Sequence, residues 1–310
     1  MGAARSSIAS RRLMADRRGH VVVIGDALID EIHDEAGVRD VVGGAALNVA
    51  VGLARLGVPT TLVAMVAEDE DGATVRAFLG RFGVRLVATP APRGTARAIA
   101  TKSDGEARYD FNDAAVHRSI DFTGAARDAL DAAPLVVVSC YPFDHDDLTD
   151  ALLDAVEDPA DRLVVDPNPR PALLSDVAAF VRNVDRVASA VRLVKLGDED
   201  AALLYGTELD DAARRLQQDG ARLVLATAGG RGASLHLPDG RLDAPVAELP
   251  GPIVDTIGAG DATLAALTDA LLRADREDGG DALFWEGALQ NAMIIAAATC
   301  RSEGPLLQLP

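Results

Sequence analysis

Short apolar runs alternate with amphipathic stretches along most of the 310-residue chain. Six runs are continuously apolar or β-branched, at residues 21–24, 61–66, 135–138, 163–165, 193–194 and 223–226. Six stretches between or after them carry apolar residues at helical spacing, at residues 45–56, 73–79, 147–156, 210–218, 261–273 and 282–299. Strands without a polar face that alternate with helices are typical of a parallel sheet covered on both sides. The pattern therefore predicts an α/β fold with a mostly parallel central sheet between two layers of helices.

Two segments interrupt this alternation. Residues 31–42 and 96–111 are polar or switch between apolar and polar positions, and Gly105 provides a turn within the second of them. Such alternation is the pattern of a sheet with one exposed face. We expect these segments to form a small antiparallel flap beside the main sheet. After Gly232, two further strands are expected at residues 233–237 and 241–249.

The composition is that of a globular protein with an acidic surplus. Apolar residues make up 49% of the chain, and 48 Asp and Glu against 30 Lys and Arg give a formal net charge of −18. The apolar fraction excludes a disordered acidic chain, and the negative charge argues against nucleic acid as a partner, since such binding depends on Lys and Arg. No apolar run reaches the roughly 18 residues needed to span a membrane. The two cysteines, Cys140 and Cys300, stand in apolar surroundings and suggest no disulfide framework, so we expect a protein of the reducing cytoplasm.

The first 20 residues differ from the rest of the chain. Residues 1–18 hold five arginines and a single acid, Asp16, without apolar periodicity. A transit peptide is rich in arginine and poor in acids in the same way, but Met14 lies within the segment and favours a simpler interpretation. We interpret residues 1–20 as a disordered or over-long N-terminal tail and residues 21–310 as the folded domain.

The most informative segment runs from Asp255 to Asp261, with the sequence Asp-Thr-Ile-Gly-Ala-Gly-Asp, and leads directly into a predicted helix. The small residues Gly258, Ala259 and Gly260 allow a tight turn in which successive amide groups point into one concavity. At a helix N-terminus these amides also gain the positive end of the helix dipole, so they suit a phosphoryl group during its transfer. Asp261 could accept the proton of an attacking hydroxyl as a general base. The alternative is that this aspartate only caps the helix.

A second glycine pair, Gly43-Gly44, precedes the first long predicted helix, and Asn48 lies one turn into that helix. Asp26 follows the first predicted strand, at the carboxyl edge where open α/β sheets place ligands. Carboxylate, amide and backbone groups offer the donors and acceptors that bind sugar hydroxyls. Asp26 and Asn48 are therefore candidates for sugar binding, with a plain turn as the alternative for Asp26.

Together these two segments resemble the signatures of the ribokinase/PfkB family of sugar kinases, in the same order and about 210 residues apart. Three further stretches match motifs of that family: Asp166-Pro-Asn-Pro-Arg170-Pro, Thr227-x-Gly229-x-x-Gly232, and the helix from Asn291 to Arg301. The first of the three is similar to a stretch of fructokinase-like and 2-keto-3-deoxygluconate-kinase-like members. The resemblance covers residues 21–307 and implies a ribokinase-like three-layer sandwich with a small β-lid.

The resemblance implies a role for each matching residue. Asp261 would be the catalytic base, and the backbone of residues 258–260 would form the anion hole for the γ-phosphoryl group of ATP. The sugar would be held by Asp26, Gly43, Gly44, Asn48 and Arg170, and ATP by Lys195, Thr227, Gly229, Gly232 and Asn291. Asp200 would bind Mg²⁺, and a monovalent cation such as K⁺ would bind near Asp255 and Ile257. The lid would be formed by residues 31–42 and 96–111, and two lids could join in a homodimer.

The chain departs from the family pattern at three places. Gly197 and Asp200 stand where relatives carry Asn-x-x-Glu near magnesium, so an acid is kept and an amide is lost. Ala64 and Ala67 replace glycines, which requires that neither position has a positive φ angle. Ala46 replaces a glycine of the ribokinase-like version, which favours other sugars over ribose.

The sequence therefore predicts an ATP- and Mg²⁺-dependent kinase of a small sugar, and the stretch at residues 166–171 favours fructose. 2-Keto-3-deoxygluconate kinase is the first alternative, because Arg170 could pair with a carboxylate, and ribokinase and nucleoside kinase follow. Outside this class the alternative is a non-catalytic sugar sensor of the same fold, which would not need an intact Asp261. No Gly-x-Gly-x-x-Gly follows the first strand, which argues against a dinucleotide-binding oxidoreductase.

Overall fold

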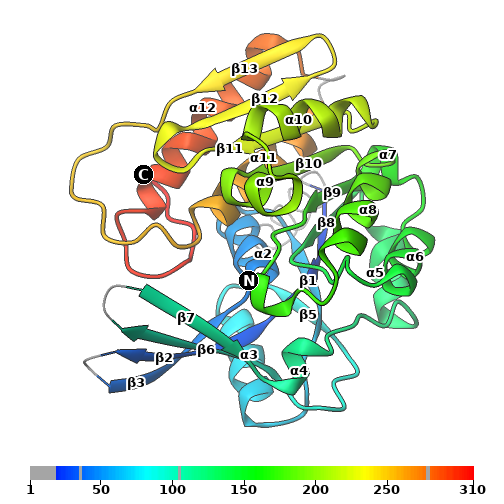
Figure 1. Ribbon diagram of the computed structural model, residues 1–310, viewed down its shortest axis with the longest axis vertical. Coiled ribbons are helices and arrows are strands. Elements are labelled where there is room, and N and C mark those ends of the chain that lie inside the picture. The colour runs from blue at the N-terminus through cyan, green and yellow to red at the C-terminus, as the bar shows by residue number, and fades with distance from the viewer. Residues whose placement is uncertain (1–18, 35–36, 104–105, 277–279) are drawn as a thin grey trace, which may run out of the picture.

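The computed structural model describes residues 19–34, 37–103, 106–276 and 280–310. A nine-stranded sheet lies at its centre, in the order β13-β12-β11-β10-β9-β8-β1-β4-β5 (Figure 1). In that order the strands are β13 (Gly240–Ala244), β12 (Ala233–Leu237), β11 (Leu223–Thr227), β10 (Leu193–Gly197), β9 (Leu163–Asp166), β8 (Leu135–Ser139), β1 (Val21–Gly25), β4 (Thr60–Met65) and β5 (Arg85–Thr89). All neighbouring pairs from β11 to β5 are parallel, whereas β12 and β13 run antiparallel to their neighbours. The prediction of a mostly parallel sheet is confirmed.

Helices cover both faces of this sheet. One face carries α2 (Ala45–Arg55), α3 (Glu70–Arg81), α11 (Ala259–Arg276) and α12 (Ala282–Thr299), and the other carries α5 (Ala125–Ala132), α6 (Asp146–Ala155), α8 (Val177–Ala188), α9 (Asp198–Tyr205) and α10 (Leu209–Gln218). Successive strand residues point to opposite faces. In β1, Val21 and Val23 therefore join the core beneath α2 and α11, whereas Val22 and Ile24 join the core on the other side. The result is the expected three-layer sandwich.

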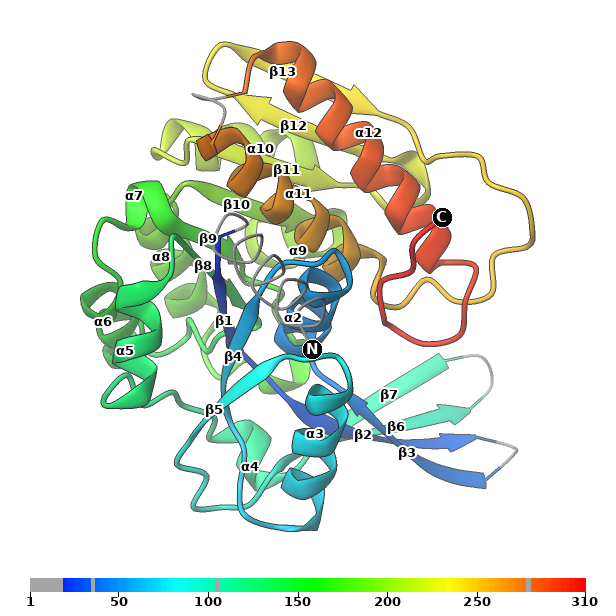
Figure 2. The same ribbon diagram turned by 180° about the vertical axis from the view of Figure 1, so that it is seen from behind.

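A second sheet of four strands stands beside the sandwich, in the order β3-β2-β6-β7. Its strands are β2 (Leu28–Asp34), β3 (Gly37–Gly43), β6 (Ala96–Ser103) and β7 (Glu106–Phe111). Figure 2 shows this small sheet projecting from the body next to α3. The expected strands at residues 31–42 and 96–111 are present, but the expectation of a fully antiparallel flap was wrong, because β2 and β6 pair in parallel. These two strands continue from β1 and β5, which themselves run in the same direction. The expected turn at Gly105 lies outside the described residues.

Some boundaries differ from the sequence-based expectation. The strand expected at residues 241–249 ends at Ala244, since Pro245 and then Pro250 and Pro252 lack the amide donors that a sheet requires. Helix α11 begins at Ala259, two residues before the expected start. Apart from short helical segments, four elements were not predicted: β5, α5, α8 and α9. Short helical segments complete the fold: α4 (Asp113–Val116), α7 (Pro159–Arg162), η1 (Pro171–Leu173) and η2 (Gly229–Arg231).

The expected N-terminal tail at residues 1–20 lies outside the described residues except for residues 19 and 20. Among the helices that the structure describes, none combines the length and apolar character required to cross a membrane.

Candidate active site

The helices α2 and α11 pack against each other and bring Asn48 to Asp261, although 213 residues separate the two in the chain. Asn48 Nδ2 donates a hydrogen bond of 2.9 Å to Asp261 Oδ2. Burial raises the pKa of Asp261 to about 7, and the hydrogen bond from Asn48 opposes this shift. A carboxylate with a pKa near neutrality is suited to take up and release a proton at physiological pH.

The loop before Asp261 has unused amide donors. Within the described chain, no acceptor lies within hydrogen-bonding distance of the backbone amides of Gly258, Gly260 and Asp261, and that of Ala259 reaches only Thr256 O at 3.3 Å. These amides stand at the first turn of α11, where the helix dipole also favours an anion. The loop can therefore receive a phosphoryl group, as the sequence predicts.

Gly258 has to be glycine for a structural reason. Its φ angle is +79°, and a Cβ atom at this position would lie 2.0 Å from the carbonyl oxygen of Pro305. The loop thus rests directly on the backbone of the C-terminal segment.

A buried ion pair lies beside the same loop. Lys195 Nζ on β10 donates to Asp166 Oδ2 on β9 at 2.9 Å, and both side chains are buried. A Cβ atom on Gly260 would lie 3.5 Å from Lys195 Nζ, so the ammonium group is adjacent to the free amides. Burial disfavours this ammonium, but the charges of Asp166 and Asp200 outweigh that effect and raise the pKa of Lys195. Lys195 therefore stays charged next to the loop; its partner Asp166 was not predicted to belong to the site.

Asp26 connects β1 to the start of α2. Its Oδ1 accepts a hydrogen bond from Ala46 N at 2.9 Å, and its carbonyl oxygen accepts one from Leu47 N at 3.2 Å. Gly44 has a φ angle of +114°, and a Cβ atom there would lie 2.6 Å from the same carbonyl oxygen. One carboxylate oxygen of Asp26 thus holds the first turn of α2, which agrees with the interpretation of Asp26 as a turn residue. The other oxygen is left for a ligand.

Asp30 on β2 belongs to the same region and was not predicted. Burial and the charge of Asp26 raise the pKa of Asp30 to about 6. A Cβ atom on Gly43 would lie 2.0 Å from Asp30 Oδ2, so Gly43 makes room for this carboxyl group. The signal in the sequence was an acid directly after the apolar residues 27–29.

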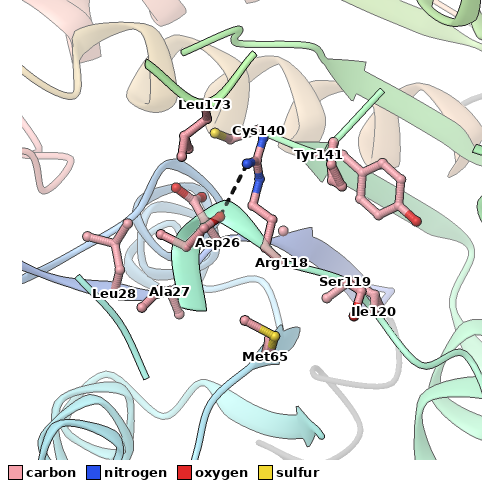
Figure 3. A pocket seen from close by; sticks show the side chains of 14 residues that line it. Asp26, Ala27, Leu28, Met65, Arg118, Ser119, Ile120, Cys140, Tyr141 and Leu173 are labelled. Carbon is pink, nitrogen blue, oxygen red and sulfur yellow. Dashed lines mark hydrogen bonds between the residues drawn. The ribbon is translucent and has the colours of Figure 1, made fainter. Parts of the chain in front are cut away.

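A pocket opens beside Asp26 at the carboxyl ends of β1, β4 and β8 (Figure 3). Its lining is mostly apolar and includes Leu28, Met65 and Leu173, and Arg118 extends into it. Arg170 follows β9 and precedes η1. The loss of hydration at part of the Arg170 side chain disfavours its charge, but the acids around it, Asp26 and Asp261 among them, raise its pKa, and the residue remains exposed. The predicted residue Arg170 is thus close to the other sugar-site candidates, and Arg118 is an addition.

The structure brings some of the predicted ATP-binding residues together. Gly197 and Thr227 are register partners at the ends of β10 and β11, and Asp200 Oδ2 accepts a hydrogen bond from Gly197 N at 2.9 Å. Gly232 has a φ angle of +95°, and a Cβ atom there would lie 2.2 Å from Ala244 O.

Two other nucleotide-site candidates have fewer neighbours. Gly229 opens η2 with a φ angle of +51° and no atom near its missing Cβ. Asn291 is exposed on α12, and its side chain forms no hydrogen bond with any residue that the structure describes. Lys195 and Thr227 thus lie next to other residues of the candidate site, whereas Asn291 does not.

Asp255 connects the loop to the end of the chain. Its Oδ1 accepts a hydrogen bond from Ile257 N at 3.0 Å and its Oδ2 one from Gly304 N at 3.3 Å. In the part of the chain that the structure describes, no group of three or more His, Cys, Asp or Glu could hold a metal ion by itself.

The sequence pattern of the pfkB family of carbohydrate kinases matches residues 18–310. The chain belongs to this family. The prediction of a carbohydrate kinase from its two glycine-rich motifs is thereby confirmed.

Relatives of this pfkB kinase include a fructokinase of Rhizobium leguminosarum bv. trifolii, which is 31% identical over 263 residues and aligns with 81% of this chain and 79% of its own. Among solved structures, a fructokinase of Xylella fastidiosa with bound ATP superposes with a TM-score of 0.77 at 20% identity, over 92% of this chain and 93% of its own. A putative ribokinase II of E. coli in complex with ATP and Mg²⁺ superposes with a TM-score of 0.75 at 22% identity, over 93% and 94%. The two structures support the ribokinase-like fold.

The backbone of this kinase allows alanine at residues 64 and 67, where the family pattern has glycine. In the described residues, only Cys140, Asp158 and Asn168 have positive φ angles without being glycine. Ala64 and Ala67 therefore adopt backbone angles that any residue allows, as required.

Proposed function

We propose that this kinase transfers the γ-phosphoryl group of ATP to a hydroxyl group of a small sugar. The observation that carries the proposal is the first turn of α11, where a carboxyl group with a pKa of about 7 adjoins three amides without acceptors. A general base next to an anion-binding nest is the arrangement that in-line phosphoryl transfer needs.

In the proposed reaction, Asp261 accepts the proton of the sugar hydroxyl. The hydroxyl oxygen forms a bond to the γ-phosphorus while the bond from phosphorus to the bridging oxygen breaks, and ADP leaves. The amides of Gly258 and Gly260 donate to the phosphoryl oxygens as the group passes between the two oxygens, with Ala259 completing the nest. Lys195 adds a fixed positive charge beside the same group.

We place ATP along the ends of β10 and β11, against Lys195, Thr227, Gly229 and Gly232, with Asn291 toward the base. The bound ATP in the Xylella fastidiosa fructokinase, which shares the fold, supports this placement. Asp200 is the residue that would hold Mg²⁺, since only one of its oxygens is taken up by Gly197 N. Mg²⁺ usually binds one or two carboxylates together with substrate phosphates, and it would neutralise phosphate charge there.

The sugar is proposed to lie between α2, α11 and the small sheet, which would act as a lid that excludes water from the transferring phosphoryl group. Asp26, Gly43, Gly44, Asn48 and Arg170 would hold it, together with Asp30. Two substrates are in question: fructose, which the names of the relatives favour, and 2-keto-3-deoxygluconate, which the charge of Arg170 favours.

A coupled assay of ADP release tests the proposal. Wild-type protein is given ATP and Mg²⁺ with fructose, 2-keto-3-deoxygluconate, ribose or a nucleoside. We expect turnover with a sugar and none with Asp261→Asn. If ATP and a sugar bind but no sugar is phosphorylated, the protein is a sensor and the proposed function is wrong.

The proposed K⁺ site near Asp255 and Ile257 is tested in the same assay. Potassium and tetramethylammonium chloride are compared at equal ionic strength. Equal rates in the two salts would remove this cation from the proposal.

A further inference from the structure

Lysine is rare in this chain. Of its 30 Lys and Arg residues, 28 are arginine, and the two lysines are Lys102 and Lys195. Lys102 belongs to β6 of the small sheet, whereas Lys195 is buried in the central sheet. An ammonium group is a compact point charge on a flexible stem, while a guanidinium is a wide planar fork. A buried lysine in a chain that otherwise uses arginine points to a place that requires a compact charge.

The ammonium group of Lys195 has donors to spare. It carries three N–H groups, and in the part of the chain that the structure describes its only hydrogen-bond partner is Asp166 Oδ2, at 2.9 Å. The backbone of Gly260 lies next to it, since a Cβ atom there would be 3.5 Å from Lys195 Nζ. The nearby amides of Gly258, Gly260 and Asp261 also lack acceptors among the described residues. An anion with several oxygens, such as a phosphoryl group, would satisfy donors of both kinds.

The side chain of Asp166 is used only for this ammonium group. Asp166 is fully buried at the end of β9, and its second oxygen, Oδ1, has no partner within the described ranges. The carboxyl groups of Asp26 and Asp255 hold backbone amides, which that of Asp166 does not. Burying a carboxylate is costly unless it is paired. The contact with Lys195 is therefore what accounts for an acid at this position.

Asp166 also keeps Lys195 charged. Burial disfavours the ammonium form, and the charge of Asp166 is the largest effect that opposes burial and raises the pKa of Lys195. Asp200 on α9 and Asp261 on α11 act in the same direction. Of these three acids, only Asp166 is hydrogen-bonded to the ammonium group and so fixes its direction.

The same pair acts on the candidate base. Burial raises the pKa of Asp261 to about 7, and the hydrogen bond from Asn48 opposes this rise. The charge of Asp166 adds to the rise, whereas those of Lys195 and Arg170 reduce it. Loss of Asp166 should therefore lower the pKa of Asp261, and loss of Lys195 should raise it.

We propose that Asp166 is a positioning residue that holds the Lys195 ammonium toward the anion-binding loop, so that its two remaining N–H groups donate to the phosphoryl group during transfer. Before ATP binds, Asp166 is the counter-charge of Lys195. During transfer the ammonium is shared between Asp166 and the phosphoryl oxygens, and neither side chain gains or loses a proton. This inference rests on the proposed kinase function and adds a residue that acts only through Lys195.

The pH profile of kcat, at saturating ATP and sugar, tests the positioning role. The wild type should show no alkaline decline up to about pH 9, because Lys195 stays charged. In Asp166→Asn the pKa of Lys195 should fall by at least ~1. An alkaline decline should then appear, the acidic limb should move to lower pH, and kcat at pH 8 should be at least ~10-fold lower. A purely structural role would move neither limb.

Asp185→Asn is the matched control for this profile. Asp185 is also an aspartate paired with a basic residue, Arg215, but the pair lies on α8 and α10, on the opposite face of the sheet from α11. Its pH profile should be that of the wild type. An Asp166→Asn profile that matches this control overturns the inference and leaves the kinase function intact.

A double variant separates positioning from an independent effect. Lys195→Met should lower kcat at least ~10², the size expected for a lost donor to the transferring group, with KM for the sugar within about threefold. Combining it with Asp166→Asn should give an enzyme at least as active as Lys195→Met alone, because Asp166 acts only through Lys195. Losses that multiply in the double variant would contradict this.

Nuclear magnetic resonance on the wild type covers the case in which these variants do not fold. Lysine labelled with carbon-13 at Cε gives two signals from this chain, and Lys102→Arg assigns them. The Lys195 signal should shift more with adenylyl imidodiphosphate than with ADP, since only the former carries a γ-phosphoryl group. Equal shifts, or none, overturn the inference. If the wild type phosphorylates no sugar, the proposed function fails and this inference with it.

Discussion

Asn48 on α2 donates its amide hydrogen to Asp261 Oδ2 on α11 at 2.9 Å, while its own carbonyl oxygen is buried and has no partner among the described residues. The amide therefore fixes the direction of the carboxylate and keeps one acceptor for a hydroxyl donor. A sugar hydroxyl placed between them would give its hydrogen to one group or the other. In the proposed reaction, this pair would link sugar binding to the removal of the proton.

Asp261→Asn tests the base directly. The substitution keeps the shape of the side chain but removes the basic oxygen, so we expect kcat to fall by at least ~10², the size of a general-base contribution. Sugar affinity, measured by calorimetry, should change little. Asp269→Asn on the same helix is the control, because Asp269 pairs with Arg273 away from the loop. Loss of binding together with activity would contradict the assignment.

The pH dependence of kcat/KM should show the raised pKa of Asp261. Only the deprotonated form is a base, so the rate should fall about tenfold per pH unit below about 7. Because the hydrogen bond from Asn48 lowers this pKa, Asn48→Ala should move the midpoint to higher pH even though its rate is also lower. The midpoints are compared in buffers of constant ionic strength. A wild-type midpoint near the ordinary value for aspartate, or no movement in Asn48→Ala, would rule out Asp261 as the titrating group.

The pair of Lys195 and Asp166 should stabilise the fold only as a pair. Removing one partner leaves a buried charge without its counter-charge, so Lys195→Met or Asp166→Asn alone should cost about 3–5 kcal/mol of unfolding free energy. The double variant should lose less than the sum of the two, which urea unfolding of the four proteins measures. Strictly additive losses would show that the two groups do not interact.

Gly258→Ala and Gly229→Ala form a matched comparison, because both glycines have positive φ angles. A Cβ atom at residue 258 meets Pro305 O at 2.0 Å, whereas one at residue 229 meets nothing within 4 Å. Gly229→Ala should therefore cost only the backbone term, about 1 kcal/mol, and Gly258→Ala clearly more. Thermal unfolding compares the two, and equal losses would mean that the contact with Pro305 is unimportant.

The hydrophobic pattern predicted the main layers because the central strands lack a polar face. In β1 and β8 every residue is buried, and helix α12 matches its predicted bounds, with Asp281 capping it through Phe284 N. The pairing of β2 with β6 was beyond such a pattern, since alternation fixes which face of a strand is buried but not which strand lies next to it. The ends of β13 were misjudged for a local reason, the prolines that follow it.

The residues of the candidate site also fall into those that the sequence predicted and those that it did not. Asp261, Asn48 and the glycines around them lie in short motifs whose chemistry can be interpreted locally. Asp166 and Lys195 meet across neighbouring strands 29 residues apart, and Arg118 reaches its pocket from the segment after α4. Such partners depend on the topology of the sheet, and no local spacing marks them.

The contact of Gly258 with Pro305 matters for how the C-terminal end of the chain can be altered. Leu307 is buried against α2, and its carbonyl oxygen accepts a hydrogen bond from Arg55, so residues 305–307 are held between that helix and the loop before α11. A protease that trims this end, or a fusion partner pulling on it, should disturb both the loop before α11 and the packing of α2. Affinity tags for purifying this enzyme accordingly belong at the opposite terminus.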